Sequence, residues 1–199
     1  MTRSCNNPQR RSLILATAAV GGIGAAVTLA PFVASMLPSE RAKAAGAPVE
    51  ADIATLEPGQ LMTIEWRGKP VWILRRTPEM LATLPGLAGQ LSDPGSLQPQ
   101  QPDSCRNAHR SIKPDILIAT GICTHLGCSP SSKFRHGANE GMNGDWPGGF
   151  FCPCHGSTFD LAGRVFKNKP APLNLVIPAH TYLSASRVLI GEAAPSNKT

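Results

Sequence analysis

Two short motifs of cysteine and histidine constrain the fold of this chain more strongly than any other feature. The first, "CTHLGC", occupies residues 123–128, and the second, "CPCHGS", occupies residues 152–157. Together they hold four cysteines and two histidines, whereas a tetrahedral zinc ion needs only four ligands. Both motifs contain glycine or proline, which is typical of loops at strand ends that fold around a buried ion and direct backbone N–H groups towards it.

The spacing within these motifs separates them from common zinc sites. One residue lies between Cys123 and His125, and one lies between Cys152 and Cys154. Zinc knuckles usually show two residues between paired cysteines. A cysteine and histidine zinc site with a spare pair of thiols remains the alternative to a redox centre.

A long uncharged segment near the N-terminus predicts a membrane anchor. Residues 13–37 carry no charged side chain. As a helix they would extend roughly 37 Å, enough to cross a hydrocarbon core of about 30 Å with some tilt. Membrane helices tolerate the glycines and the proline of this segment because neighbouring groups satisfy the freed backbone.

The residues before this segment favour export. Arg10 and Arg11 directly precede the apolar run, a pattern that resembles a bacterial twin-arginine signal. An ordinary positive-inside anchor and a cleaved secretory peptide are the alternatives, although the apolar region of a cleaved peptide is usually shorter. We expect a retained single-pass anchor in the bacterial inner membrane, with residues 1–12 in the cytoplasm and the chain after residue 37 in the periplasm.

The net charge of +6 and the pI of about 9.2 do not indicate nucleic-acid binding. The basic residues are scattered after the anchor, and an exported domain would not meet DNA. We therefore expect no nucleic-acid partner.

The rest of the chain predicts an all-β fold. Residues 38–49 are rich in alanine, glycine and proline and read as a linker, flexible or partly helical. Short β-branched and aromatic runs separated by turn signals then predict an antiparallel β domain over residues 50–199, a sandwich or barrel. The expected strands lie in 49–56, 60–66, 70–76, 116–120 and 148–151, with two or three more among 173–178, 181–186 and 187–191. One short helix is expected in 77–91, capped by Thr77, with a loop over 92–115 and a solvated connection over 131–149.

The pair of motifs resembles that of the Rieske [2Fe-2S] proteins. The resemblance implies that Cys123 and Cys152 bind one iron and that His125 and His155 bind the other. It also implies that Cys128 and Cys154 form a disulfide between the loops, as an exported compartment permits, within a cluster-binding subdomain of about residues 120–172. Neutral imidazoles in place of two thiolates make the cluster easier to reduce, and they can couple electron gain to proton gain.

Residues around the motifs match further family positions. The resemblance implies that Ser157 donates a hydrogen bond to a bridging sulfide and that Leu126 shields the cluster, although a loop serine that caps backbone and a packed leucine are the alternatives. Phe159 stands where high-potential members carry a tyrosine, which predicts a potential lower by about 20 to 65 mV if one hydrogen bond is lost. Residues 169–175, "KPAPLNL", resemble the proline-rich loop that covers the cluster, with Lys169 in place of the usual glycine.

The resemblance to the Rieske subunit of the bacterial ubiquinol:cytochrome c oxidoreductase, the cytochrome bc complex, covers nearly the whole chain. It implies that the chain is part of a quinol–cytochrome-c reductase in a respiratory or photosynthetic chain. Its partners would be a cytochrome b subunit, a haem-bearing cytochrome c subunit and ubiquinol, in a dimeric complex. Residues 38–49 would be the hinge on which the soluble domain moves, and His155, with His125, would take part in proton transfer from quinol.

Two alternatives remain. One is the small Rieske subunit of a periplasmic molybdenum oxidase such as arsenite oxidase, in which a retained anchor is less expected. The other is a non-redox module stapled by zinc, which would be colourless and lack a reduced-state EPR signal. Outside the motifs, we expect Cys5 in the cytoplasm, Cys105 as a free thiol, and His109, His136 and His180 in surface or packing roles.

Overall fold

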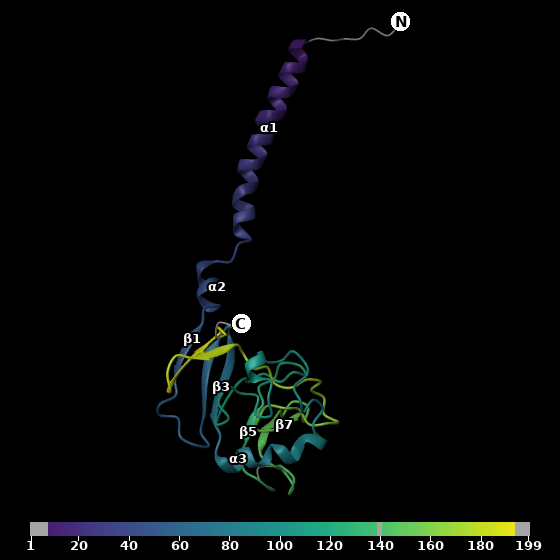
Figure 1. The fold of residues 1–199 in the computed structure, drawn as a ribbon. Helices are drawn as coiled ribbons and strands as arrows, with labels where there is room; N and C mark the ends of the chain where they lie inside the picture. The colour runs from purple at the N-terminus through teal and green to yellow at the C-terminus, as the bar shows by residue number, and fades with distance from the viewer. Residues whose placement is uncertain (1–7, 139–140, 194–199) are drawn as a thin grey trace. The chain divides into compact units, whose positions relative to one another are not determined.

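The computed structural model describes residues 8–138 and 141–193 and divides the chain into two compact units. The first unit ends at Ala44, and the second, called the head below, begins at Ala45 (Figure 1). Cys5 lies outside the described residues. The expected linker over 38–49 therefore contains the boundary between the two units.

The first unit is helical. Helix α1 (Pro8–Ser35) is long and apolar enough to cross a membrane, and all of its residues are exposed. Its hydroxyl groups donate to carbonyls one turn back, Thr17 to Leu13 and Thr28 to Gly24, so they need no water. The helix begins five residues before the start of the expected anchor (13–37) and ends two residues before the end of that anchor. A short helix, α2 (Glu40–Ala45), lies in the expected linker.

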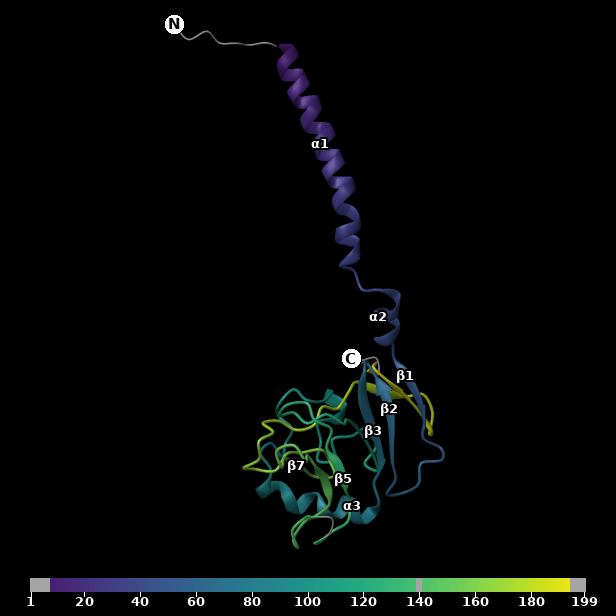
Figure 2. The ribbon, with the colours of Figure 1, turned by 180° about the vertical axis from the view of Figure 1, so that it is seen from behind.

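The head consists of three antiparallel three-stranded sheets, which confirms the all-β prediction. The central sheet has the order β2-β3-β4. Figure 2 shows the third sheet beside helix α3, away from the C-terminal strands. The central sheet contains β2 (Leu61–Trp66), β3 (Lys69–Arg75) and β4 (Ile116–Thr120); the second contains β1 (Val49–Asp52), β9 (Arg187–Ile190) and β8 (His180–Tyr182); the third contains β5 (Ser131–Lys133), β6 (Gly149–Phe151) and β7 (Thr158–Phe159).

Strands β3 and β4 of the central sheet are buried on both faces over most of their length. Val71 and Ile73 of β3 pack into one apolar cluster with Val188 of β9. Trp72, between them, points to the opposite face, where its ring stacks on Phe150 of β6 at a centroid distance of 4.8 Å. This alternation follows from the two-residue period of a strand. The central sheet thus packs with one face on the sheet that contains β9 and with the other face on the sheet that contains β6.

Helix α3 (Pro78–Thr83) follows β3. The Thr77 side chain accepts a hydrogen bond from the Met80 N–H and caps the helix, as predicted. Pro85 ends the α-helix and begins a 3-10 helix, η1 (Pro85–Gln90), which was not predicted. A second 3-10 turn, η2 (Asp103–Cys105), lies in the expected loop.

The tail holds two strands, β8 and β9, out of the two or three expected, and the connection 131–149 differs from its expectation. Residues 173–178 are not a strand, because their backbone groups bond to different segments: the Leu175 N–H to Gly163 and the Ile177 N–H to Gln100. The connection 131–149 is not wholly solvated. It contains β5, and its Trp146 is buried and donates its indole N–H to the Lys133 carbonyl.

Buried arginines hold the turn 160–164 that follows β7. Arg110 is fully buried and donates to the carbonyls of Ala162, Gly163 and Leu175 and to the Gln101 side chain. Arg76 donates to the Leu161 carbonyl, and Arg164 forms a buried ion pair with Asp160. Burial lowers the pKa of Arg110 to about 10, and the nearby Asp160 carboxylate opposes this shift. Buried charged side chains therefore support this turn in addition to its own backbone hydrogen bonds.

Candidate metal centre

The two motifs form loops with the same backbone hydrogen bonds. In loop 1 (residues 123–128) the first N–H donates to the sixth carbonyl, Cys123 to Cys128, over 2.7 Å, and the Gly127 N–H donates back to Cys123 over 3.1 Å. In loop 2 (residues 152–157) the equivalent bonds measure 2.8 Å and 2.9 Å. The glycine at the fifth position has φ of 84° in loop 1 and 75° in loop 2, a conformation that glycine adopts without strain.

Different elements position the two loops. Loop 1 follows β4, every residue of which is buried. Loop 2 joins β6 to β7, which pair with each other. The ends of two sheets therefore bring the loops together, as the sequence predicted for loops at strand ends.

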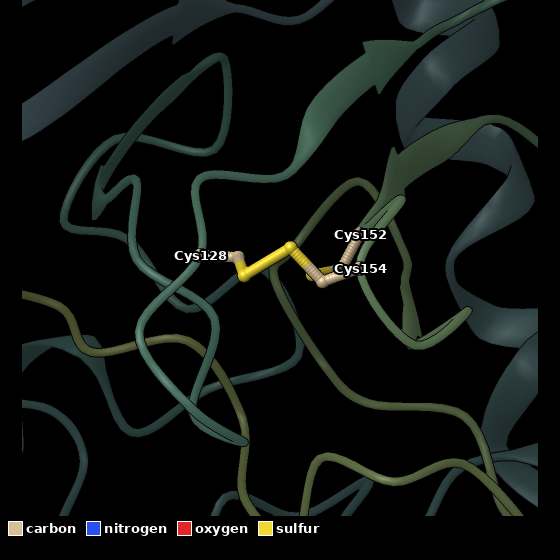
Figure 3. Close-up of side chains that lie close together, drawn as sticks. All are labelled: Cys128, Cys152 and Cys154. Atoms are coloured by element: carbon tan, nitrogen blue, oxygen red, sulfur yellow. A yellow bond between two sulfur atoms is a disulfide. The ribbon is translucent and has the colours of Figure 1, made fainter.

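A disulfide joins the loops (Figure 3). Cys128 of loop 1 is bonded to Cys154 of loop 2, which confirms the expected pairing. The Cys152 sulfur lies within 4.8 Å of both disulfide sulfurs. Because a disulfide sulfur is not a thiolate, Cys128 and Cys154 do not belong to the ligand set, and the free cysteines among the described residues are Cys105, Cys123 and Cys152.

The remaining motif residues form two pairs, one of sulfurs and one of imidazoles. Cys123 and Cys152 are each 2% exposed, and their side chains are within hydrogen-bonding reach of each other. The rings of His125 and His155 meet edge to face with centroids 4.7 Å apart. His155 is exposed and His125 is partly buried. One pair therefore lies in the interior, and the other faces outwards.

The donor set fits a binuclear iron centre with mixed ligands. Two free thiols and two imidazoles are the four donors that a Rieske cluster uses. The His125 Nδ1 atom is buried and has no hydrogen-bond partner among the described residues. A buried polar atom of this kind normally has a partner, and a bound metal would supply one.

Burial is the largest influence on the Cys123 thiol and raises its pKa. The His125 backbone N–H lowers this pKa, the neighbouring Cys152 sulfur raises it, and the Ser157 side chain lowers it by a hydrogen bond. A metal must therefore displace a proton from this sulfur when it binds, so that metal binding and proton release are coupled.

The structure places the other predicted site residues around these pairs. Ser157 is fully buried in loop 2, and its Oγ accepts a hydrogen bond from the Ala171 N–H over 3.0 Å. Leu126 is 70% exposed at the tip of loop 1, so it is not a packed core residue. Phe159 is fully buried, and Lys169 is exposed.

Sequence reasoning missed the contacts of two residues, Thr124 in loop 1 and Ala171 after loop 2. The Thr124 hydroxyl donates to the Leu173 carbonyl over 2.6 Å, and Ala171 contacts Ser157 as described above. Each interaction joins residues far apart in sequence, and no local pattern marks either. Away from the loops, Cys105 is a buried free thiol, as expected, and His180 is buried with its Nδ1 atom 2.9 Å from the Pro178 carbonyl.

Family models match two parts of the chain. Residues 1–39 match the model described as "Ubiquitinol-cytochrome C reductase Fe-S subunit TAT signal". Residues 97–179, which include both loops, match the "Rieske [2Fe-2S] domain". These matches confirm the expected export signal type and imply one [2Fe-2S] cluster.

Relatives resemble the chain over most of its length. The ubiquinol-cytochrome c reductase iron-sulfur subunit of Allochromatium vinosum is 61% identical over 94% of this chain and 90% of its own. The subunit of the same name from Blastochloris viridis is 40% identical over 92% of each chain. Among solved structures, a chain of "Hyperthermophilic respiratory Complex III" is 25% identical, with a TM-score of 0.47 over 87% of this chain and 97% of its own.

The paired loops, the export signal and the identity over most of the chain lead to one assignment. The N-terminal apolar helix, in a relative of these subunits, fits a membrane-anchored protein. The chain belongs to the family of Rieske iron-sulfur subunits of ubiquinol-cytochrome c reductase, the cytochrome bc complex.

Proposed function

We propose that Cys123 and Cys152 hold one iron of the cluster, that His125 and His155 hold the other, and that the histidine pair receives the proton when quinol is oxidised. When bound, the cluster accepts one electron and passes it on. The proposed roles of the cysteines and histidines differ with their exposure to solvent. The buried thiolates exclude water from one side of the centre, and the exposed His155 ring presents a donor or acceptor to a substrate.

The observation that carries this proposal is the arrangement of the four side chains. Two free buried sulfurs lie within hydrogen-bonding reach, two imidazoles lie 4.7 Å apart, and the neighbouring sulfurs are joined in a disulfide. A zinc site would need no such separation of sulfurs from imidazoles. The arrangement supports different ligands on two metal ions, with the imidazoles next to the substrate.

The relatives' names support a place for this chain in a multisubunit complex. We propose that it works with a cytochrome b subunit and a haem-bearing cytochrome c subunit, that ubiquinol is the electron donor, and that the complex is dimeric. The apolar helix α1 anchors the chain in the inner membrane, and the twin-arginine pattern at Arg10 and Arg11 supports a periplasmic head. Residues 38–49, which contain α2, would form the hinge.

The experiment is redox-poised EPR on isolated membranes, with iron and acid-labile sulfide measured on the purified complex. We expect two irons and two sulfides per chain, as in any [2Fe-2S] centre, and a signal that appears on reduction. Cys123→Ser and Cys152→Ser should each abolish the signal. Cys105→Ala is the matched control, because it removes a buried free cysteine outside the loops and should leave the signal intact.

Stoichiometric zinc without sulfide would overturn the proposal and support the zinc-stapled module. Loss of the signal in Cys105→Ala but not in Cys152→Ser would overturn the ligand assignment alone. Copurification with b-type and c-type haems tests the proposed partners separately. A molybdenum cofactor in their place would instead support a molybdenum oxidase.

A further inference from the structure

The segment that covers the loops is fastened to both of them. Residues 170–173, called the strap below, follow Lys169. The Ala171 N–H donates to the Ser157 Oγ of loop 2, and the Leu173 carbonyl accepts from the Thr124 hydroxyl of loop 1. The strap therefore touches one side chain of each loop through its own backbone.

The bond to Ser157 restricts where its hydroxyl proton can point. A serine hydroxyl has one proton to donate and lone pairs that accept. The Ala171 N–H occupies a lone pair, so the proton must be directed away from the strap. Ser157 and Ala171 are 0% and 3% exposed, so the competition of bulk water for either group is small. The Ser157 side chain lowers the pKa of the Cys123 thiol by a hydrogen bond, so the Cys123 sulfur is an acceptor within reach of the hydroxyl.

Within residues 170–172 of the strap, Ala171 supplies the one backbone N–H. Ala171 lies between Pro170 and Pro172, and neither proline has an N–H group. Pro172 also confines the residue before it to extended backbone, while Pro170 has a fixed φ. The two prolines thus hold the Ala171 N–H in one orientation at low entropic cost.

We propose that the Ala171 N–H is a positioning group that turns the Ser157 hydroxyl towards the Cys123 side of the centre and so makes the centre easier to reduce. A proton donor near a cluster sulfur stabilises the more negative, reduced form. The strap would then affect the midpoint potential through Ser157, without touching the metal. This inference rests on the proposed ligand role of Cys123.

The test is a double-mutant cycle in the assembled complex, read as the midpoint potential by redox-poised EPR. Ala171→Pro removes the N–H, and Ser157→Ala removes the hydroxyl. We expect each single variant to lower the midpoint, and at least half of the drop caused by Ala171→Pro to disappear in the Ser157→Ala background. Thr124→Val is the matched control, because it cuts the other fastening of the strap and should shift the midpoint equally in both backgrounds.

A second variant keeps the test decisive if Ala171→Pro does not assemble a cluster. Pro172→Ala retains the N–H but releases the restriction on Ala171, and it should lower the midpoint in the unmodified background and not in the Ser157→Ala background. Equal drops in both backgrounds would overturn the inference while leaving the proposed function intact. Absence of a reduced [2Fe-2S] signal in the unmodified protein would instead overturn the proposed function.

Discussion

The two loops share one backbone frame and carry different side chains. Both begin with a buried cysteine and have glycine at the fifth position, with matching hydrogen bonds. Loop 1 has histidine at the third position and leucine at the fourth, whereas loop 2 has cysteine at the third and histidine at the fourth. The shared backbone therefore sets the position and direction of each side chain. The residue type at each position then decides whether that side chain is a proposed ligand, a disulfide cysteine or an exposed group.

The loops also differ in what supports them from behind. Loop 1 continues from β4 in the middle of the head, among apolar side chains. The chain after loop 2 reaches the turn 160–164 within a few residues, and buried arginines hold that turn. Both loops thus rest on one apolar cluster, which includes Cys123 and Cys152, and loop 2 has in addition a turn held by buried charge. Substitutions in that turn should therefore affect loop 2 more than loop 1.

The largest expected effect is on the support of loop 2. Arg110→Met should destabilise the chain by about 3 to 5 kcal/mol, because buried carbonyls lose their charged donor. Thermal unfolding in detergent measures the change, and hydrogen exchange should then show the Gly156 amide opening before the Gly127 amide. Arg106→Met is the control. It breaks an exposed ion pair with Asp103 and should change stability by less than about 1 kcal/mol.

Removing the staple should affect both loops together. Cys128→Ala combined with Cys154→Ala should cost about 3.5 kcal/mol, the chain-entropy value for a closed loop of this length. Calorimetry of the unmodified and double-variant chains, with and without reductant, measures it. Reductant should lower the transition of the unmodified chain alone, and an equal shift in the double variant would contradict this account.

The shared frame predicts equal, smaller effects at its two glycines. Gly127→Ala and Gly156→Ala should each cost about 1 to 2 kcal/mol, because each residue has positive φ. A Cβ at either position would meet no atom within 4 Å, so the backbone conformation is the sole penalty. Thermal unfolding of the two variants side by side tests the similarity, and a difference well above 1 kcal/mol would show that the frames are not equivalent.

The smallest effect on stability is expected at the tip of loop 1. Leu126→Ala should change the free energy of unfolding by less than about 0.5 kcal/mol, because the side chain is already exposed. If Leu126 shields the centre, quinol oxidation by the complex should nevertheless slow. A stability loss above 1 kcal/mol with an unchanged rate would make it a packing residue instead.

Local sequence patterns predicted the longer strands and the helix cap. The short β-branched and aromatic runs of β2, β3 and β4 and the cap at Thr77 are confirmed. The short strands β5 and β7 were missed, because two or three residues carry too little periodicity. Residues 173–178 have strand composition, but long-range partners divide their backbone bonds among several segments.

The candidate site shows the same division. The motif residues and the disulfide could be identified from spacing and resemblance, since they lie within two short segments. The strap's bond to Ser157 and the arginine support of the turn 160–164 could not, because each joins segments distant in sequence. Arg110 lies in a polar stretch that predicts a loop, and its burial depends on carbonyls up to 65 residues away.

The complete burial of the Arg110 guanidinium group has a consequence for the order in which the head folds. Its four acceptors are separated from it by between 9 and 65 residues along the chain. Each distant acceptor requires a loop closure before the guanidinium gains that partner, and topologies dominated by such non-local contacts fold slowly. The charge should therefore remain hydrated through most of the folding reaction and lose its water only in the last step.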